Sequence, residues 1–212
     1  GFCRRMLQRH AFESGADFDA ELVPDARALV EEGVHDFIAR TLHDASPHLL
    51  AHLKYRKVRP EGLVDIAMQV VSEPDLVVVP GRPEGGIPDE GFVQSACRAL
   101  FVAWDQHGED ALAVLNAAAE HGDLNGNTWG EKRRLDREDK LRAFFMERTF
   151  PSMTMVEGFL KHYGSAELAK KTNKGRTTPG HVMFDDVQRL SNAMSVLTAE
   201  LDRWLLGFKH EL

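Results

Sequence analysis

"FDDVQRLSNAMSVLTAELDRWLLGF", residues 184–208, is the stretch that decides the fold class of this chain. Its apolar residues alternate at intervals of three and four over three heptads, which is the pattern of a long helix with a narrow apolar seam. Such a seam packs against other helices, either those of the same chain or those of a partner. We keep both alternatives, and the second predicts assembly into a homo-oligomer or larger complex. The predicted interface residues are Val187, Leu190, Met194, Leu197, Leu201, Trp204 and Phe208.

The rest of the chain is also divided into segments of helical length by proline and glycine. One helix is expected to start at Ser46 and Pro47, a hydroxyl cap followed by proline at the first helical position. We predict a mainly α fold, a multi-helix bundle of about eight to nine helices with at most one short strand, at Leu76 to Val79. The other predicted helices lie near 24–42, 61–72, 89–107, 109–121, 130–149, 152–163 and 165–173.

A length of 212 residues favours one compact domain. Within it we distinguish an N-terminal helical part at 1–79, a Pro/Gly-rich loop at 80–91 and a C-terminal helical part at 92–212. The loop is a candidate for a lid or a joint between the two parts.

Composition predicts a folded cytoplasmic protein. Hydrophobic residues make up 43% and charged residues 28%, as in ordinary globular proteins. The longest apolar run is "ALFVAW", residues 99–104, which is far shorter than the roughly 20 residues of a membrane span. The start of the sequence lacks the apolar core of a secretory signal. Cys3 and Cys97 form no CxxC pair, so we interpret both as free thiols.

Charge is distributed unevenly along the chain. Residues 131–176 hold 12 Lys and Arg against 7 Asp and Glu, whereas the remainder holds 14 against 26. A basic face of this kind can attract a polyanion. Acidic residues interleaved in 131–142 oppose that effect, because they can form ion pairs within one helix. The predicted nucleic-acid-binding residues are Lys132, Arg133, Arg134, Arg137, Lys170, Lys171, Lys174 and Arg176.

The later part of this basic segment, residues 164–184, resembles a helix-turn-helix, with Asn173 at the turn. Pro179 falls in the middle of what would be the recognition helix and would interrupt it. What remains is a basic loop suited to phosphate oxygens.

A second candidate site is "HDFIARTLHDASPHLLAH", residues 35–52. Its His-Asp pairs resemble those of metal-dependent phosphohydrolases of the HD class, which would use His43, Asp44, His48 and His52 here. His48 and His52 are spaced to share one helical face. These residues make a metal-dependent phosphohydrolase the alternative function. Against it, no Glu follows His48 to act as a base.

A third candidate, "HGDLNGNTWGEKRR" at residues 121–134, has oxygen ligands at the spacing of a calcium loop. Thr128 replaces the required glycine and Arg134 the final carboxylate, so we interpret the stretch as a polar turn around Asn125 and Gly126. Neither a metal nor a cofactor is predicted.

The function favoured by these patterns is binding rather than catalysis. We find no nucleophile with its base and no glycine-rich phosphate loop, so we lean against an enzyme. The leading hypothesis is a helical binding or regulatory subunit that contacts nucleic acid or an acidic partner through 131–176 and assembles through its C-terminal helix. A second alternative is an acidic inhibitor or immunity-type protein, which would use the acidic remainder of the chain.

Overall fold

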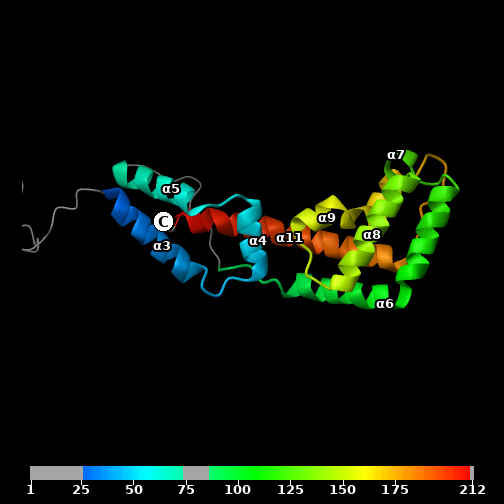
Figure 1. Cartoon of the computed structure of the whole chain (residues 1–212), viewed down its shortest axis with the longest axis horizontal. Coiled ribbons are helices and arrows are strands. Elements are labelled where there is room, and N and C mark those ends of the chain that lie inside the picture. The colour runs from blue at the N-terminus through cyan, green and yellow to red at the C-terminus, as the bar shows by residue number, and fades with distance from the viewer. Residues whose placement is uncertain (1–25, 74–85, 211–212) are drawn as a thin grey trace, which may run out of the picture. The chain divides into compact units, whose positions relative to one another are not determined.

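A computed structural model describes residues 26–73 and 86–210 of the chain (Figure 1). In these two ranges it contains nine α-helices and one 3-10 helix, and its only β feature is an isolated bridge. The predicted mainly helical bundle is confirmed. The predicted strand at Leu76 to Val79 and Cys3 both lie outside the described residues. No helix in the described ranges combines the length and apolarity needed to cross a bilayer.

The chain divides into two units. In the first, α3 (Ala26–Thr41) packs against α5 (Pro60–Ser72). Arg27 at the start of α3 forms an ion pair of 3.3 Å with Asp65 on α5. Both side chains of this pair are about half exposed or more, so it adds little to the packing.

The second unit is built on two long helices, α6 (Gly91–Glu120) and α11 (Val182–His210), which pack against each other. Figure 1 shows the shorter helices arranged around this pair. Four of them, α4, α9, η1 and α10, also contact α11, and α8 contacts α6. The shorter elements are α4 (Pro47–Tyr55), α7 (Gly126–Trp129), α8 (Glu131–Glu147), α9 (Met153–Gly158), η1 (Leu160–Tyr163) and α10 (Ser165–Lys171).

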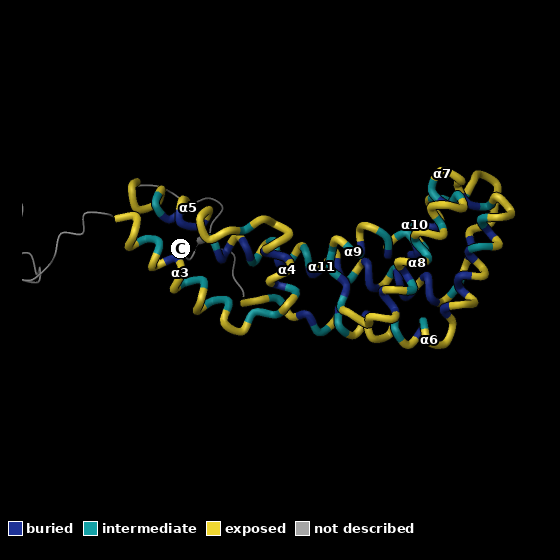
Figure 2. The backbone as a smooth tube through the Cα atoms, in the orientation of Figure 1, coloured by how far each residue is buried: buried dark blue, intermediate teal, exposed yellow. Residues whose placement is uncertain are grey.

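The heptad seam of α11 lies in the core of the chain (Figure 2). Six of its seven residues are at most 3% exposed, and only Trp204 is half-buried. Packing against the chain's own helices therefore accounts for the heptad pattern without a partner helix. Assembly through α11 stays a prediction.

Local signals set several helix ends as expected. Ser46 caps α4, where its Oγ accepts a hydrogen bond of 3.0 Å from the Leu49 amide, and Pro47 opens the helix. α6 ends just before Gly122, whose φ of 71° places it in the left-handed region that glycine tolerates. The helix predicted at 152–163 is divided into α9 and η1.

The predicted break at Gly108 is wrong, because α6 continues through it. A Cβ at this position would lie 2.6 Å from the indole of Trp104, which packs over the glycine. That indole stacks on the ring of Phe145 in α8, with centroids 4.0 Å apart and planes 6° from parallel. Gly108 thus provides space for an aromatic contact between two helices instead of ending one.

We expect Gly108→Ala to lower the free energy of unfolding. Alanine gains about 1 kcal/mol in helix propensity, but displacing the Trp104 ring costs about 1 to 3 kcal/mol. Urea unfolding followed by circular dichroism measures the balance. Gly33→Ala in α3 is the matched control, because no atom lies within 4 Å of its added Cβ and the propensity gain remains. A Gly108→Ala protein as stable as the control would contradict the steric explanation.

Candidate nucleic-acid interface

The two ends of the predicted basic segment are held together by backbone pairing between the stretch before α7 and the stretch after α10. The Asn125 amide donates to the Lys171 carbonyl at 2.8 Å, and the Asn173 amide donates to the Asp123 carbonyl at 2.7 Å. These bonds flank the antiparallel bridge between Leu124 and Thr172. Figure 1 shows the loop after α10 running beside α7. We call this pairing of 122–125 with 171–173 the interlock.

The side chain of Asn173 strengthens the interlock. Its Nδ2 donates to the Gly122 carbonyl at 2.9 Å and to the Leu124 carbonyl at 3.1 Å. Sequence reasoning placed Asn173 at a turn but could not assign these partners, which lie about fifty positions earlier in the chain. The only sequence signal for the pairing was a turn-forming asparagine on each side.

Basic side chains lie next to both stretches of the interlock in the sequence. On one side, the basic residues from Lys170 to Arg176 lie at the end of α10 and in the loop after it. On the other side, residues 122–125 lead through the short helix α7 to the first turn of α8, which carries Lys132 and Arg133. All of these basic side chains are exposed or half-exposed. We call this set the basic junction, and its residues are Lys132, Arg133, Lys170, Lys171, Lys174 and Arg176.

Carboxylates neutralise the basic junction only in part. Lys170 and Lys171 share Glu167, each at 3.7 Å, and Arg176 lies 3.7 Å from Asp123. These pairs are long, and their basic side chains are 37% to 72% exposed, so each pair contributes little. Within the part of the chain that the structure describes, no carboxylate lies within 4.0 Å of Lys132, Arg133 or Lys174.

Three of the predicted nucleic-acid-binding residues make contacts within the connection between α7 and α8. Arg134 has a side chain only 13% exposed and lies 3.6 Å from Glu120. Arg137 donates to the Thr128 carbonyl at 2.8 Å, and its guanidinium lies 5.3 Å from the centroid of the Trp129 ring. Both are half-buried, so we leave them out of the basic junction. Arg133 donates to the Asn127 carbonyl but is exposed, so we keep it.

A solvent-open hollow of about 330 Å³ lies on the α8 side of the interlock. The helix begins there after Gly130, which supplies no side-chain cap. The amides of a helix's first turn have no partner within the helix and favour anions. Glu131 opposes an anion in this hollow, whereas Lys132 and Arg133 favour one. The lining residues are Gly126, Asn127, Gly130, Glu131, Lys132 and Arg133.

The middle and end of α8 differ from its start, because their basic side chains pair with carboxylates. Lys140 lies 2.7 Å from Asp136 on the same helix. Arg142 binds Glu138 and also Glu109 on α6, and Arg148 reaches Asp105 on α6 at 2.6 Å. The positive charge available to a ligand therefore comes from the two ends of 131–176 and not from the whole segment.

The His-rich stretch does not form the metal site of the alternative hypothesis. Among the described residues, no group of three or more His, Cys, Asp or Glu side chains could hold a metal ion. His43 and Asp44 lie in the turn after α3, and His48 and His52 lie on α4. The described residues therefore give the phosphohydrolase alternative no metal-binding cluster.

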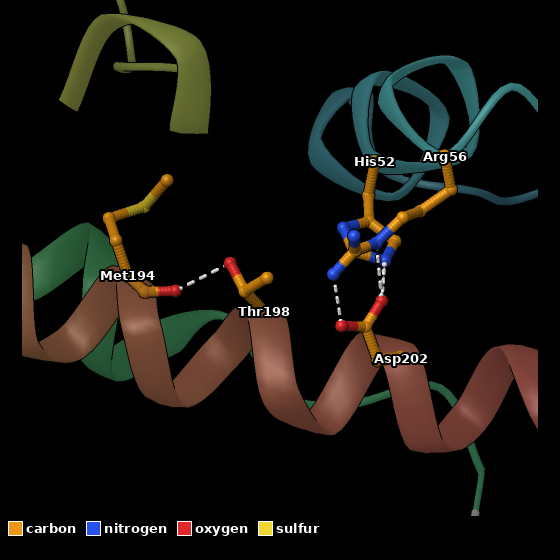
Figure 3. A network of polar contacts seen from close by, with 5 residues as sticks. All are labelled: His52, Arg56, Met194, Thr198 and Asp202. Atoms are coloured by element: carbon orange, nitrogen blue, oxygen red, sulfur yellow. Dashed lines mark hydrogen bonds and ion pairs between the residues drawn. The ribbon is translucent and has the colours of Figure 1, made fainter. Parts of the chain in front are cut away.

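His52 is instead part of a polar network with α11 (Figure 3). Its Nε2 lies 3.0 Å from Oδ1 of Asp202, and the Arg56 Nε donates to the same oxygen at 2.7 Å. One helical turn earlier, the Thr198 hydroxyl donates to the Met194 carbonyl at 2.8 Å. Because Asp202 already binds a guanidinium, a metal cation next to His52 would be repelled.

Three partly buried histidines give the second unit a defined response to pH. Burial lowers the pKa of His48, His52 and His162. The unfolded chain therefore binds protons at a higher pH than the folded chain, beginning near the ordinary histidine value of about 6.5. It follows that the folded state loses stability as the pH falls through and below that value.

We expect the free energy of unfolding to decrease from pH 7 to pH 5, and to decrease less in His162→Phe. His162 has an Nδ1 without a hydrogen-bond partner, so phenylalanine removes a titrating group without breaking a bond at that atom. Urea unfolding at a series of pH values measures both slopes. An unchanged slope in the variant would contradict a contribution from His162.

Cys97 is a free thiol on α6, as expected from the sequence. It is buried, and burial raises the pKa of its thiol to about 11. The thiolate, which is the nucleophilic form, is therefore scarce at neutral pH. Cys97 therefore packs in the core, and its thiol is a weak nucleophile at neutral pH.

The chain is similar in sequence to part of a known protein. No family model matches the chain. Over 195 residues the chain is 27% identical to the RecBCD enzyme subunit RecB of Escherichia coli (strain K12). The match covers 90% of this chain but only 16% of RecB, so the chain spans about one sixth of that protein's length.

Proposed function

We propose that this chain is a helical binding module that contacts the phosphates of nucleic acid through the basic junction. The observation that carries the proposal is the interlock, since it pairs two stretches that each lie next to basic side chains, although these lie about forty positions apart in the sequence. Nucleic-acid affinity comes largely from cations placed along the phosphate backbone. Nothing in the basic junction reads base edges, so we expect binding without strong sequence preference.

The weak pairing within the basic junction supports this function. Lys132, Arg133 and Lys174 have no carboxylate partner among the described residues, and the pairs of Lys170, Lys171 and Arg176 are all 3.7 Å long. A phosphate can replace such carboxylates at little cost, because exposed ion pairs contribute about 0 to 1 kcal/mol each. The basic junction can therefore keep its weak ion pairs in the absence of nucleic acid and exchange them for phosphates when a polyanion binds.

The similarity to RecB supports the same proposal at a coarse level. It is consistent with an association with nucleic acid, and with a place for this chain in a larger enzyme complex. In that setting the helical core would act as a rigid support, and the basic junction would supply contacts to the backbone of the nucleic acid.

Fluorescence anisotropy with labelled single-stranded DNA, double-stranded DNA and RNA across a salt series tests the proposal. The variant reverses three exposed lysines of the basic junction, Lys132→Glu, Lys170→Glu and Lys174→Glu. We expect a loss of affinity of at least about tenfold at low salt, and a salt slope smaller by about one for each lost phosphate contact.

The matched control reverses three exposed basic residues elsewhere in the second unit, Lys54→Glu, Arg98→Glu and Arg203→Glu. It changes the net charge by the same amount, so it should lower affinity much less if the basic junction is the site. Equal losses in both variants would show a non-specific charge effect, and no binding by the native chain at low salt would reject the proposal.

Asn173→Ala tests the role of the interlock without changing any charge. It removes two hydrogen bonds to the Gly122 and Leu124 carbonyls and leaves only the backbone pairing, so the two basic segments should be held less firmly. We expect weaker nucleic-acid binding with the overall helical content retained. Unchanged affinity would show that the Asn173 side chain is not needed for binding.

A further inference from the structure

A cleft of about 250 Å³ opens where the N-terminal ends of α4 and α6 meet the stretch before α9. It shares no residue with the basic junction. Pockets for drug-sized ligands are larger, about 300 to 1,000 Å³, so this cleft suits a small group or a single side chain. Its lining residues are Ser46, Pro47, His48, Ala51, Glu90, Gln94, Phe150 and Ser152.

Glu90 gives the cleft a negative charge that no Lys or Arg of the described residues matches. The residue is only 8% exposed, and its carboxylate accepts a hydrogen bond from the Ser46 hydroxyl. It precedes α6 but makes no side-chain bond to the amides of that helix. No Lys or Arg of the described ranges lies within ion-pair distance of it. Buried carboxylates are normally paired, because removing them from water is costly.

The groups around Glu90 are arranged for a donor of hydrogen bonds. The single hydroxyl proton of Ser46 is donated to Glu90, and its oxygen accepts from the Leu49 amide at 3.0 Å. His48 packs edge-on against Phe150, with ring centroids 3.9 Å apart, and its Nε2 is buried without a partner. Burial lowers the pKa of His48, and the charge of Glu90 opposes this only in part. A neutral imidazole cannot serve as the counter-ion, but it can accept a hydrogen bond.

We propose that this cleft binds an organic cation, a guanidinium or ammonium group carried on an alkyl chain. The cationic head would donate to the Glu90 carboxylate, beside the His48 ring that lines the same cleft. The Phe150 ring supplies an aromatic wall of the kind that cations prefer. Two sources offer this chemistry, the arginine or lysine side chain of a polypeptide and a free small cation.

Nuclear magnetic resonance of the full ¹⁵N-labelled chain tests the proposal with three probes. They are N-acetyl-arginine amide, its neutral analogue N-acetyl-citrulline amide, and agmatine as a free cation. We expect saturable shifts at the start of α4 and α6 with both cations and none with the citrulline probe. Tighter binding of the capped arginine would assign the site to a polypeptide side chain, and tighter binding of agmatine to a free cation.

Three variants separate the role of Glu90 from general effects. Glu90→Gln keeps an acceptor for Ser46 but removes the charge, so we expect binding to weaken by about tenfold or more. Ala51→Leu narrows the cleft without touching Glu90 and should weaken binding sterically. Glu147→Gln, an exposed glutamate on α8, should leave binding unchanged. Absence of saturable shifts in the native chain, equal binding of the citrulline probe, or unchanged binding in Glu90→Gln would overturn the proposal.

Discussion

Phe144→Ala is expected to lower the free energy of unfolding by about 3 to 5 kcal/mol, the usual cost of removing a buried aromatic side chain. Phe144 on α8 is 1% exposed, and its ring lies 5.0 Å from Phe145 and 5.5 Å from Phe101 on α6. It also reaches Phe159, at 6.3 Å, just after α9. Because one ring joins three parts of the second unit, its loss leaves a cavity that no single neighbour can fill. Urea unfolding followed by circular dichroism measures the loss.

Met146→Ala is the matched control on the same helix. Met146 is 84% exposed, so its truncation should change the stability by no more than about 0.5 kcal/mol. A similar loss in both variants would mean that α8 as a whole, and not the aromatic core under it, determines the result.

Leu190→Ala on α11 is expected to cost about 2 to 5 kcal/mol, independently of protein concentration. Leu190 belongs to the heptad seam and is 0% exposed within the chain's own fold. If the seam is an internal contact, its loss destabilises each molecule alone. If it joins two chains, the unfolding midpoint rises with concentration, because association stabilises the folded state by mass action. Thermal unfolding over a hundredfold range of concentration separates the two.

Val196→Ala provides the comparison for α11. It is 51% exposed and lies off the seam, so we expect a small change in stability. A midpoint that shifts with concentration in the native chain would restore the assembly predicted from the heptads. A midpoint that stays constant, with a large loss only in Leu190→Ala, would assign the seam to the core.

The contrast between the two ends of 131–176 and its middle also bears on function. Arg142 and Arg148 pair with Glu109 and Asp105 of α6, and these contacts fasten α8 to the long helix. Their charge is therefore used to hold two helices together. The ion pairs of the basic junction among the described residues are longer, at 3.7 Å, which is why we propose nucleic-acid contact there and not along α8.

The sequence by itself determined the helices and several of their ends. The sequence predicted the seam of α11, the start of α4 at Ser46 and Pro47, and a helix end near 121. Periodicity and capping depend on residues within a few positions of one another, which is why these features could be predicted. The helical fold class followed from those local patterns.

Only the tertiary structure decided how distant segments meet. It paired 122–125 with 171–173, turned His52 toward Asp202 and placed Trp104 over Gly108. A glycine ends a helix at Gly122 but makes room for an aromatic ring at Gly108. The local sequence cannot distinguish these two roles. Which partner a polar or basic side chain finds depends on the packing of the whole unit, since the competing carboxylates and carbonyls come from other helices.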